Sequence, residues 1–329
     1  MSGEMKNQSG KLSPEALSRS VFGALGAVRP EVIVGPAVGE DAAVIRWPGE
    51  KLLVFAADPI VGAAKGAGKL LVRINVNDIA SKGGEPAYIA VTLIFPPHMG
   101  ESAVSGVMSE IHIECKRLGI AVVGGHTEFN DFYNHPVLSA ALIGTADRAY
   151  VASDIRPGDV IFVTGHIGTE GMAILASDRP DLLKGVMSES ETAEIEGWME
   201  ETSVLEESRL MRDHASFMHD PTEGGFWGGL GEICRLSGLS ADIDVASAPL
   251  HEYTRRVSTA LGFDPLSLVA SGSLMAVVSA EKAHIAEGVF AESGVALSRV
   301  GRMTDRPYLA ADMTAPPEEL WGLLKRDLA

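Results

Sequence analysis

Acidic residues stand at the ends of apolar segments in the first quarter of the chain. Glu40 and Asp41 follow a glycine-rich loop and precede the apolar run AAVI. Asp58 ends the run LLVFAA, and Asp78 lies within NVNDIA. An acid beside a buried run needs a partner, and Mg²⁺ binds through one or two carboxylates while water completes its octahedron. Taken singly, each acid is better explained as a turn residue, a helix cap or half of a surface ion pair. Taken together, they indicate a shared metal site.

The segment KGAGKLL places Lys69 directly after a glycine, as the end of a P-loop does. Ala63 stands where that motif begins with glycine, however, and Leu70 replaces the hydroxyl residue that would hold Mg²⁺. It is therefore not a Walker motif. Its glycines and lysines are consistent either with a flexible lid over phosphate or with a mobile surface loop.

A second glycine-rich segment, HDPTEGGFWGG, leads into a predicted helix. It contains Asp220, Thr222, Gly224 and Gly225. Exposed N–H groups at a helix start form a pocket for anions, so this segment predicts an anion site. An ordinary capped helix N-terminus explains the same residues equally well.

The segment GGHTEF combines a glycine pair with two potential metal ligands. Gly124 and Gly125 would allow close approach of the backbone to a ligand. His126 and Glu128 are two residues apart, so on a strand they would face the same side. Alone they are weak evidence for a metal site. Together with His219 they define a third and weaker hypothesis, a metal-dependent hydrolase.

Composition excludes several classes of protein. The 329 residues include 27 lysines and arginines against 44 aspartates and glutamates, a formal net charge of −17. Such a surface repels phosphate backbones and anionic lipid, so we expect neither nucleic-acid nor membrane binding. Nucleotides remain possible if acidic residues first hold Mg²⁺. The only cysteines, Cys115 and Cys234, lie in amphipathic helical patterns, which predicts core packing and excludes a disulfide scaffold.

The chain shows no targeting signal. Its N-terminal segment is polar, without the apolar core of a signal peptide. The most apolar stretch, AYIAVTLIFPP, is far shorter than the roughly 20 residues that span a bilayer. Together with the low cysteine content, this predicts a soluble, cytoplasmic protein.

Apolar patterns and glycine or proline punctuation predict the elements that position these residues. Through residue 152 the order is β-β-β-α-β-α-β-β, with a further helix predicted near residues 15–28. After the linker SDIRPGD the alternation restarts, and residues 181–213 form a long acidic helical stretch with a solvated face. We therefore expect an α+β protein with a disordered tail at 1–12, domains at 13–152 and 153–310, and a C-terminal tail or helix at 311–329.

Seven fragments, in this order, resemble a known superfamily. They are GEDAAVI, FAAD, NVNDIASKGGEP, GGHTEF, RPGDVIFVTGHIGTEGMAIL, HDPTEGG and GFDPLSLVASGSLMAVV. Together they are similar to the AIR synthase (PurM-like) superfamily over about residues 30–305. Within it the resemblance is greatest to the hydrogenase maturation factor HypE.

The resemblance implies a PurM-like fold, a homodimer whose N-terminal strands form a β-barrel, and ATP with Mg²⁺ in a cleft between the two domains. It implies Mg²⁺ ligation by Asp41, Asp58 and Asp78, with Glu40, His126 and Glu128 as further candidate ligands. It also implies nucleotide contacts from Lys69, Asn77, Gly124, Gly125, Asp220, Thr222, Gly224 and Gly225.

Three departures affect the expected function. HypE ends in a Pro-Arg-Ile-Cys tail, whereas this sequence has no cysteine after Cys234. His126 stands where several relatives have an acid, and Glu40 stands where kinases of the superfamily have the first of two aspartates. We therefore expect an ATP- and Mg²⁺-dependent phosphoryl-transferring synthetase or kinase acting on a small molecule. The alternative is a non-catalytic dimer that binds nucleotide or a metabolite and assists a partner protein in metallocofactor maturation.

Overall fold

The computed structural model describes residues 30–35, 37–47, 49–61, 66–308 and 318–326. The predicted tail at 1–12 and the helix predicted near 15–28 lie outside these residues. Within them, no helix has both the length and the apolar character needed to cross a membrane.

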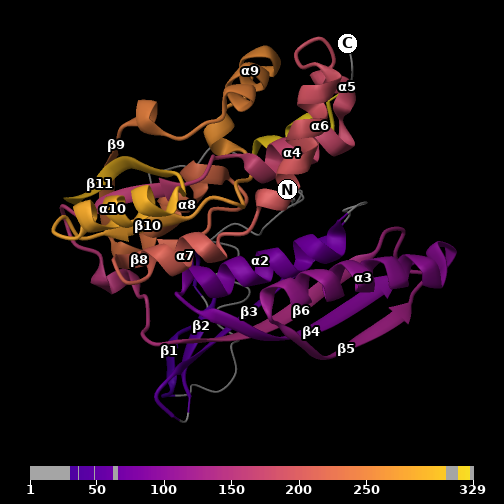
Figure 1. The fold of residues 1–329 in the computed structure, drawn as a ribbon, viewed down its shortest axis with the longest axis horizontal. Helices are drawn as coiled ribbons and strands as arrows, with labels where there is room; N and C mark the ends of the chain where they lie inside the picture. The colour runs from indigo at the N-terminus through magenta and orange to yellow at the C-terminus, as the bar shows by residue number, and fades with distance from the viewer. Residues whose placement is uncertain (1–29, 36, 48, 62–65, 309–317, 327–329) are drawn as a thin grey trace, which may run out of the picture.

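The N-terminal part is a six-stranded open sheet with two helices on one face (Figure 1). The strand order is β1-β2-β3-β6-β4-β5, and every pairing is antiparallel except that of β4 with β5. The strands are β1 (Val32–Val34), β2 (Ala43–Arg46), β3 (Leu52–Val61), β4 (Glu85–Phe95), β5 (Ala121–Phe129) and β6 (Val137–Ala146). The helices are α2 (Ala67–Ser81) and α3 (Gly100–Leu118), with a 3₁₀ turn at Pro97–Met99 before α3. The predicted order of elements is confirmed.

One face of this sheet is covered and the other is open. Burial alternates along β6, since every second side chain packs under the helices and the others point away. The described strands form no closed barrel within one chain, so the barrel implied by the resemblance would require a second copy and stays a prediction.

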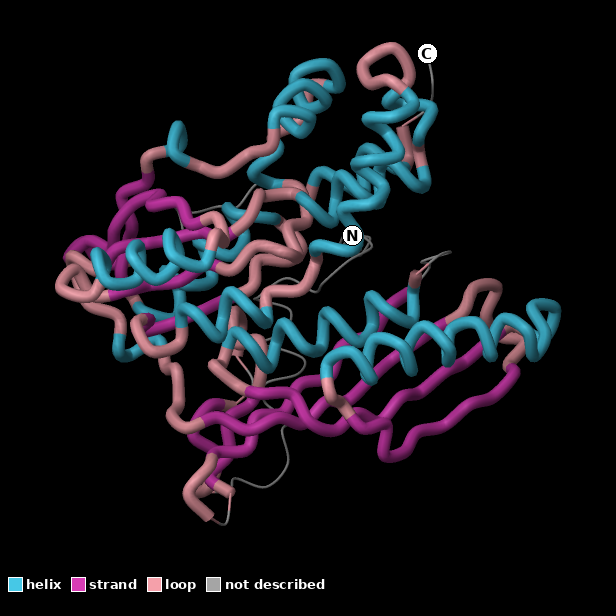
Figure 2. Tube along the Cα trace, viewed as in Figure 1, coloured by secondary structure: helices cyan, strands magenta, loops and turns pink. Residues whose placement is uncertain are grey.

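Helix α2 packs very close to the sheet and is buried over nearly its whole length. A Cβ atom at Gly144 on β6 would lie 2.5 Å from the Ile79 side chain, so this approach requires glycine. Figure 2 shows α2 between the N-terminal sheet and the C-terminal part. It contacts both α7 and β8. Burial on both sides explains why its apolar residues do not form a single stripe.

The C-terminal part is a five-stranded antiparallel sheet of order β8-β10-β7-β11-β9. Its central strand β7 and its neighbour β10 are buried at every residue, as expected for strands covered on both faces. The strands are β7 (Val160–Thr164), β8 (Ala215–His219), β9 (Leu239–Ile243), β10 (Met275–Val278) and β11 (Leu297–Pro307). The helices are α4 (Thr169–Asp178), α5 (Pro180–Leu183), α6 (Glu189–Gly197), α7 (Leu205–Met211), α8 (Gly225–Ser237), α9 (Glu252–Leu261), α10 (Ala283–Ser293) and α11 (Glu319–Leu324). The α+β fold class is confirmed.

The predicted long acidic helix over 181–213 is wrong. The segment is divided among α5, α6, the 3₁₀ turn η3 (Trp198–Glu201) and α7. Gly185 adopts a left-handed φ of 85°, which ends the first piece, and Ser188 with Glu191 forms a capping box that starts α6. Its acidic face is not wholly solvated either, because Glu200 binds Lys69 and Arg73 on α2.

The two parts share one hydrophobic core. The cluster that contains Leu71 and Val76 of α2 continues into Phe162 of β7 and Met218 of β8. Polar contacts also cross the interface between the N-terminal and C-terminal parts, which we call the seam. Glu85 at the start of β4 forms ion pairs of 2.7 and 2.6 Å with Arg209 of α7 and with Arg212, the residue after that helix. Both apolar packing and ion pairs therefore hold the two parts together.

Candidate functional site

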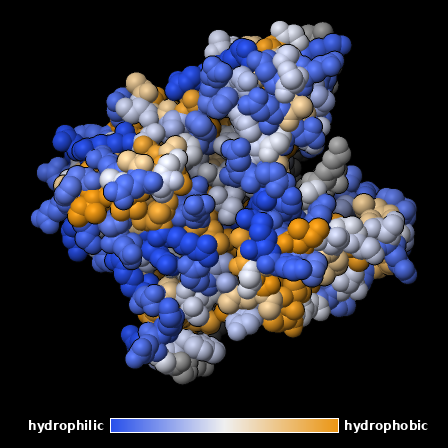
Figure 3. Space-filling model, in the orientation of Figure 1, coloured by the Kyte–Doolittle hydropathy of each residue, from blue (hydrophilic) through white to orange (hydrophobic). Residues whose placement is uncertain are grey.

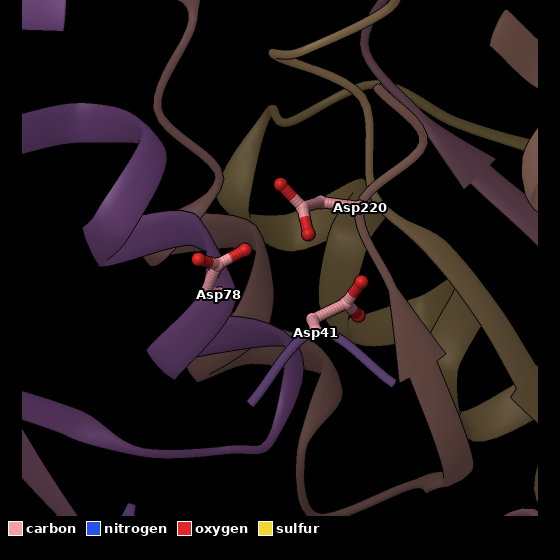
Figure 4. A group of neighbouring side chains, drawn as sticks. All are labelled: Asp41, Asp78 and Asp220. Atoms are coloured by element: carbon pink, nitrogen blue, oxygen red, sulfur yellow. The ribbon is translucent and has the colours of Figure 1, made fainter. Parts of the chain in front are cut away.

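Three aspartates meet at the seam between the two parts. Asp41 lies just before β2, Asp78 lies on α2, and Asp220 follows β8. One carboxylate oxygen from each lies within 4.8 Å of the others, and Figure 4 shows the three carboxylates converging. Asp78 and Asp220 are buried, and Asp41 is half-buried. Three converging carboxylates form the hard-oxygen donor set that suits Mg²⁺, so the residues present fit this ion.

The Asp41 loop reaches the C-terminal part because Gly39 lacks a side chain. Gly39 has a left-handed φ of 87°, and a Cβ atom there would lie 2.7 Å from the Cβ of Glu232 on α8. Any larger residue would hold the loop away from α8. Glycine at this position therefore lets an acid of the N-terminal part join one of the C-terminal part.

His219 at the end of β8 fixes Asp41 from the other side. Its Nδ1 lies 2.8 Å from Asp41 Oδ2, and its Nε2 lies 2.8 Å from Glu232 Oε2. Burial lowers the pKa of His219, but the two carboxylates outweigh burial and raise it to about 10. Burial also raises the pKa of Asp41, but the charges of His219 and Lys82 lower it overall. The lowered pKa favours the ionised form of Asp41, whose Oδ2 lies on His219.

Glu40 is separated from the cluster by an ion pair of its own. Its Oε2 lies 2.5 Å from Nζ of Lys82, whose side chain is completely buried. The predicted metal-ligand candidate Glu40 is thus engaged by a cation of the chain itself.

Asp58 on β3 lies outside the group of three converging aspartates. Its backbone is held by Asn75 of α2: the Asp58 N–H donates to Asn75 Oδ1 at 3.0 Å, and the Asn75 amide donates back to the Asp58 carbonyl at 3.3 Å. These contacts tie β3 to α2, and ligation by Asp58 stays a prediction.

The two predicted phosphate contacts on α2 are engaged across the seam. Lys69 Nζ lies 2.5 Å from Glu200 Oε1. The fully buried Asn77 donates to the carbonyl of Thr202 at 2.8 Å and accepts from the N–H of Val204 at 2.9 Å. In this conformation both side chains hold the two parts together.

The glycine pair and the His-x-Glu pair lie on the edge strand β5. Gly125 approaches the backbone of β4, since a Cβ atom there would lie 2.0 Å from the Val91 carbonyl oxygen. His126 is exposed and Glu128 is half-buried, and their side chains contact each other at 3.2 Å. They do not gather with His219, which lies on β8 of the other sheet with both ring nitrogens on carboxylates. This arrangement removes support for the hydrolase hypothesis.

The predicted anion pocket at the start of α8 holds a carboxylate of the same chain. Glu318, at the N-terminus of α11, accepts hydrogen bonds from the N–H groups of Gly224 at 2.6 Å and Val269 at 3.1 Å. The Thr222 carbonyl accepts from Gly225 at 3.0 Å, which closes the turn. In this conformation the Glu318 carboxyl group occupies these N–H groups, and binding of an external anion there stays a prediction.

Sequence reasoning missed Lys82 and Glu232 and gave His219 a different role. A completely buried lysine carries no local signal when it follows a regular helix. Glu232 and His219 are 13 residues apart, so their contact depends on α8 folding back along β8. The one available signal was the fragment HDP, in which a polar pair ends an apolar strand.

Comparison with known proteins decides the family. The chain matches the AIR synthase related protein family, its N-terminal domain over residues 39–146 and its C-terminal domain over residues 156–313. The chain belongs to the AIR synthase related family. The resemblance found in the sequence, to the PurM-like superfamily and to HypE-like proteins within it, is confirmed.

Two relatives illustrate the likeness within this family. A putative hydrogenase expression/formation protein of Methanocaldococcus jannaschii is 30% identical over 252 residues, 74% of this chain and 73% of the relative. A carbamoyl dehydratase HypE of Rhizobium leguminosarum is 27% identical over 253 residues, 74% of this chain and 71% of the relative.

Solved structures share the fold. One described as AaThiL complexed with AMPPCP and TMP has a TM-score of 0.71 at 18% identity, covering 86% of this chain and 91% of that one. A chain of a structure described as a HypE–HypF complex has a TM-score of 0.68 at 21% identity, covering 82% of this chain and 88% of that one. At these identities the likeness shows the fold alone.

Proposed function

We propose that this AIR synthase related protein is an ATP- and Mg²⁺-dependent enzyme that transfers a phosphoryl group to a small molecule. The observation that carries the proposal is the convergence of Asp41, Asp78 and Asp220 at the seam. A divalent ion held there would neutralise phosphate charge, and phosphoryl transfer depends mainly on positioning and on such neutralisation. This also explains how so acidic a chain would bind a nucleotide.

The residues of the chain have separate tasks in this proposal. Asp41 and Asp78 from the N-terminal part and Asp220 from the C-terminal part would hold the ion. His219 orients Asp41 through its hydrogen bond. The N–H groups of Gly224 and Val269 bind an oxyanion, the task that Glu318 now fulfils. The two parts thus supply complementary groups, cation-binding carboxylates and anion-binding amides.

Relatives support a nucleotide as the ligand. The AaThiL structure contains AMPPCP, an ATP analogue, and shares this fold. Lys69, Gly124 and Gly125 stay proposed nucleotide contacts. Reaching a nucleotide would require Lys69 to leave Glu200, a contact that is partly exposed to water and therefore weak.

Calorimetric titration with AMPPCP, with and without Mg²⁺, tests the proposal. We expect Mg²⁺-dependent binding in the wild type and its loss in Asp78→Asn. Asp154→Asn, which changes an exposed aspartate in the 3₁₀ turn η2 (Ala152–Asp154), serves as the matched control and should bind normally. Asp58→Asn determines whether Asp58 joins the site. Absence of Mg²⁺-dependent binding in the wild type would refute the proposal.

A second function is supported by the names of the relatives. They include hydrogenase expression proteins, and one HypE structure is a complex with HypF. We propose as the alternative that the protein binds nucleotide without turnover and assists a maturation partner. ATP turnover measured with mixtures of metabolites separates the two, with Asp78→Asn as the control. Turnover lost in the variant supports the enzyme, and binding without turnover supports the assisting role.

We also propose that the N-terminal sheet pairs with a second copy. Exposed apolar side chains occur on β5 and beside it, including Val123 at 61% and Phe132 at 90% exposure, and Figure 3 shows apolar patches over this part of the molecule. An edge strand exposed at every residue but Glu128 is a site for further pairing. Light scattering after size-exclusion chromatography should give a dimer for the wild type and a monomer for Val123→Asp. A monomeric wild type would contradict the proposal.

A further inference from the structure

A buried lysine lies beside the aspartate cluster, where an apolar residue would be easier to accommodate. Lys82 is the C-cap of α2, and its side chain is completely inaccessible to solvent. Its Nζ lies 2.5 Å from Glu40 Oε2 and 4.6 Å from the ring centre of Phe217 on β8. A buried ion pair is rarely more stable than an apolar pair of similar size. The pair therefore calls for a reason other than stability.

Glu40 indicates that reason. Glu40 directly precedes Asp41, so a fourth carboxylate lies next to one of the cluster's three aspartates in the sequence. Its side chain is 10% exposed. Lys82 thus holds the carboxylate that directly precedes Asp41 in the chain, through a contact of 2.5 Å.

Cation affinity in oxygen sites follows the number and charge of the carboxylate ligands. Mg²⁺ sites that act on nucleotides usually have few carboxylates and complete their coordination with phosphate oxygens. A fourth carboxylate would bind cations without a nucleotide and would favour larger ions such as Ca²⁺. Withholding Glu40 therefore changes the conditions under which the cluster fills.

We propose that Lys82 is a positioning residue that sets the specificity of the metal site. By holding Glu40 it keeps a further carboxylate out of the donor set that includes Asp41, Asp78 and Asp220, so that a divalent ion binds tightly only together with the phosphates of a nucleotide. The inference rests on the proposed function and deepens it, because it makes metal binding depend on nucleotide binding.

The test is a titration of the metal-free, full-length protein with Mn²⁺ alone, with free Mn²⁺ followed by electron paramagnetic resonance. Lys82→Met keeps an unbranched side chain, one atom shorter than that of lysine, and removes its charge. We expect this variant to bind Mn²⁺ at least about tenfold more tightly than the wild type, because Glu40 and one uncompensated charge join the site. Glu40→Gln should bind more weakly than the wild type. The double variant should return to within about threefold of the wild type, because both charges are gone.

Lys51→Met is the matched control. It removes a lysine from a surface ion pair with Asp147, and its Mn²⁺ affinity should equal that of the wild type. If Lys82 had a merely structural role, Mn²⁺ affinity would fall in Lys82→Met and in the double variant. The proposal instead predicts that Mn²⁺ affinity rises in Lys82→Met and falls in Glu40→Gln.

The proposal is overturned if folded Lys82→Met binds Mn²⁺ no more tightly than the wild type, or if none of the variants binds it. If Lys82→Met does not fold, the comparison of Glu40→Gln with the double variant tests the same charge, and equal affinities there overturn the proposal. The proposed function fails separately, through absence of Mg²⁺–AMPPCP binding in the wild type. The Mn²⁺ order is measured without nucleotide, so the two failures are distinguishable.

Discussion

Replacing Asn77 by alanine should lower the stability of the protein, because the main role of this side chain is structural. The Asn77 side chain is completely buried and joins α2 to the segment before α7 through the Thr202 carbonyl and the Val204 N–H. Alanine leaves both backbone groups buried without these partners. An unpaired buried polar group costs about 1–3 kcal/mol, so two of them cost about 2–6 kcal/mol. We expect a loss of about 3 kcal/mol in the free energy of unfolding.

Equilibrium unfolding in urea measures this loss, with Asn134→Ala as the control. Asn134 is exposed, and its replacement should change the free energy of unfolding by less than about 0.5 kcal/mol. The resemblance to nucleotide-binding relatives predicts a different result for Asn77→Ala, normal stability with weakened AMPPCP binding. A variant that unfolds at the same urea concentration as the wild type would refute the structural argument.

Two further predictions concern pH and backbone geometry. Burial, with the neighbouring charge of Glu206, raises the pKa of Glu207 on α7 from 4.5 to about 7. The folded protein thus holds this proton more tightly than the unfolded chain, and stability is lost as pH rises from about 4.5 to about 7. Glu207→Gln should match the wild type at pH 4 and exceed its stability by up to about 3 kcal/mol at pH 8, and equal urea midpoints at pH 8 would contradict this. Gly125→Ala should lower the melting temperature, with a cost of at least about 2 kcal/mol, because its Cβ would lie 2.0 Å from the Val91 oxygen at a φ of 150°. Gly124→Ala is its control, since a Cβ there meets no atom within 4 Å, and equal melting temperatures would show that β5 shifts freely.

Local chemistry was sufficient to predict most elements. Helix α3 ends where its periodic pattern meets Gly119, which adopts a left-handed φ of 73°, and the alternation in β6 reflects one covered face. The long helical stretch predicted over 181–213 is interrupted, because helix propensity is a weak guide where tertiary contacts compete. Glu200 illustrates the competition, since its η3 turn is held against α2 by Lys69 and Arg73.

The site was harder to predict than the fold, because its contacts join distant parts of the chain. Asp41 and Asp78 were expected as metal ligands, but Asp220 was expected only as a nucleotide contact. Its place in the cluster depends on β8 ending against α2, which no local pattern encodes. The same holds for Glu40, whose partner Lys82 is 42 residues away. An acid's partner decides its role, and partners at this separation are set by tertiary packing.

The core shared by α2 and the C-terminal sheet also determines how the protein unfolds and how the sequences of its two halves can diverge in evolution. Leu71 and Val76 are fully buried in the cluster that contains Phe162 and Met218. A hinge opening at this seam would expose apolar surface to water, at a free-energy cost of about 25 cal/mol for each Å² exposed. We therefore expect the two halves to unfold as one cooperative unit rather than as independent lobes. An N-terminal half produced alone would expose the outer side of α2 to water and would self-associate. Substitutions on either side of the seam are therefore coupled, and the two halves are constrained to diverge together.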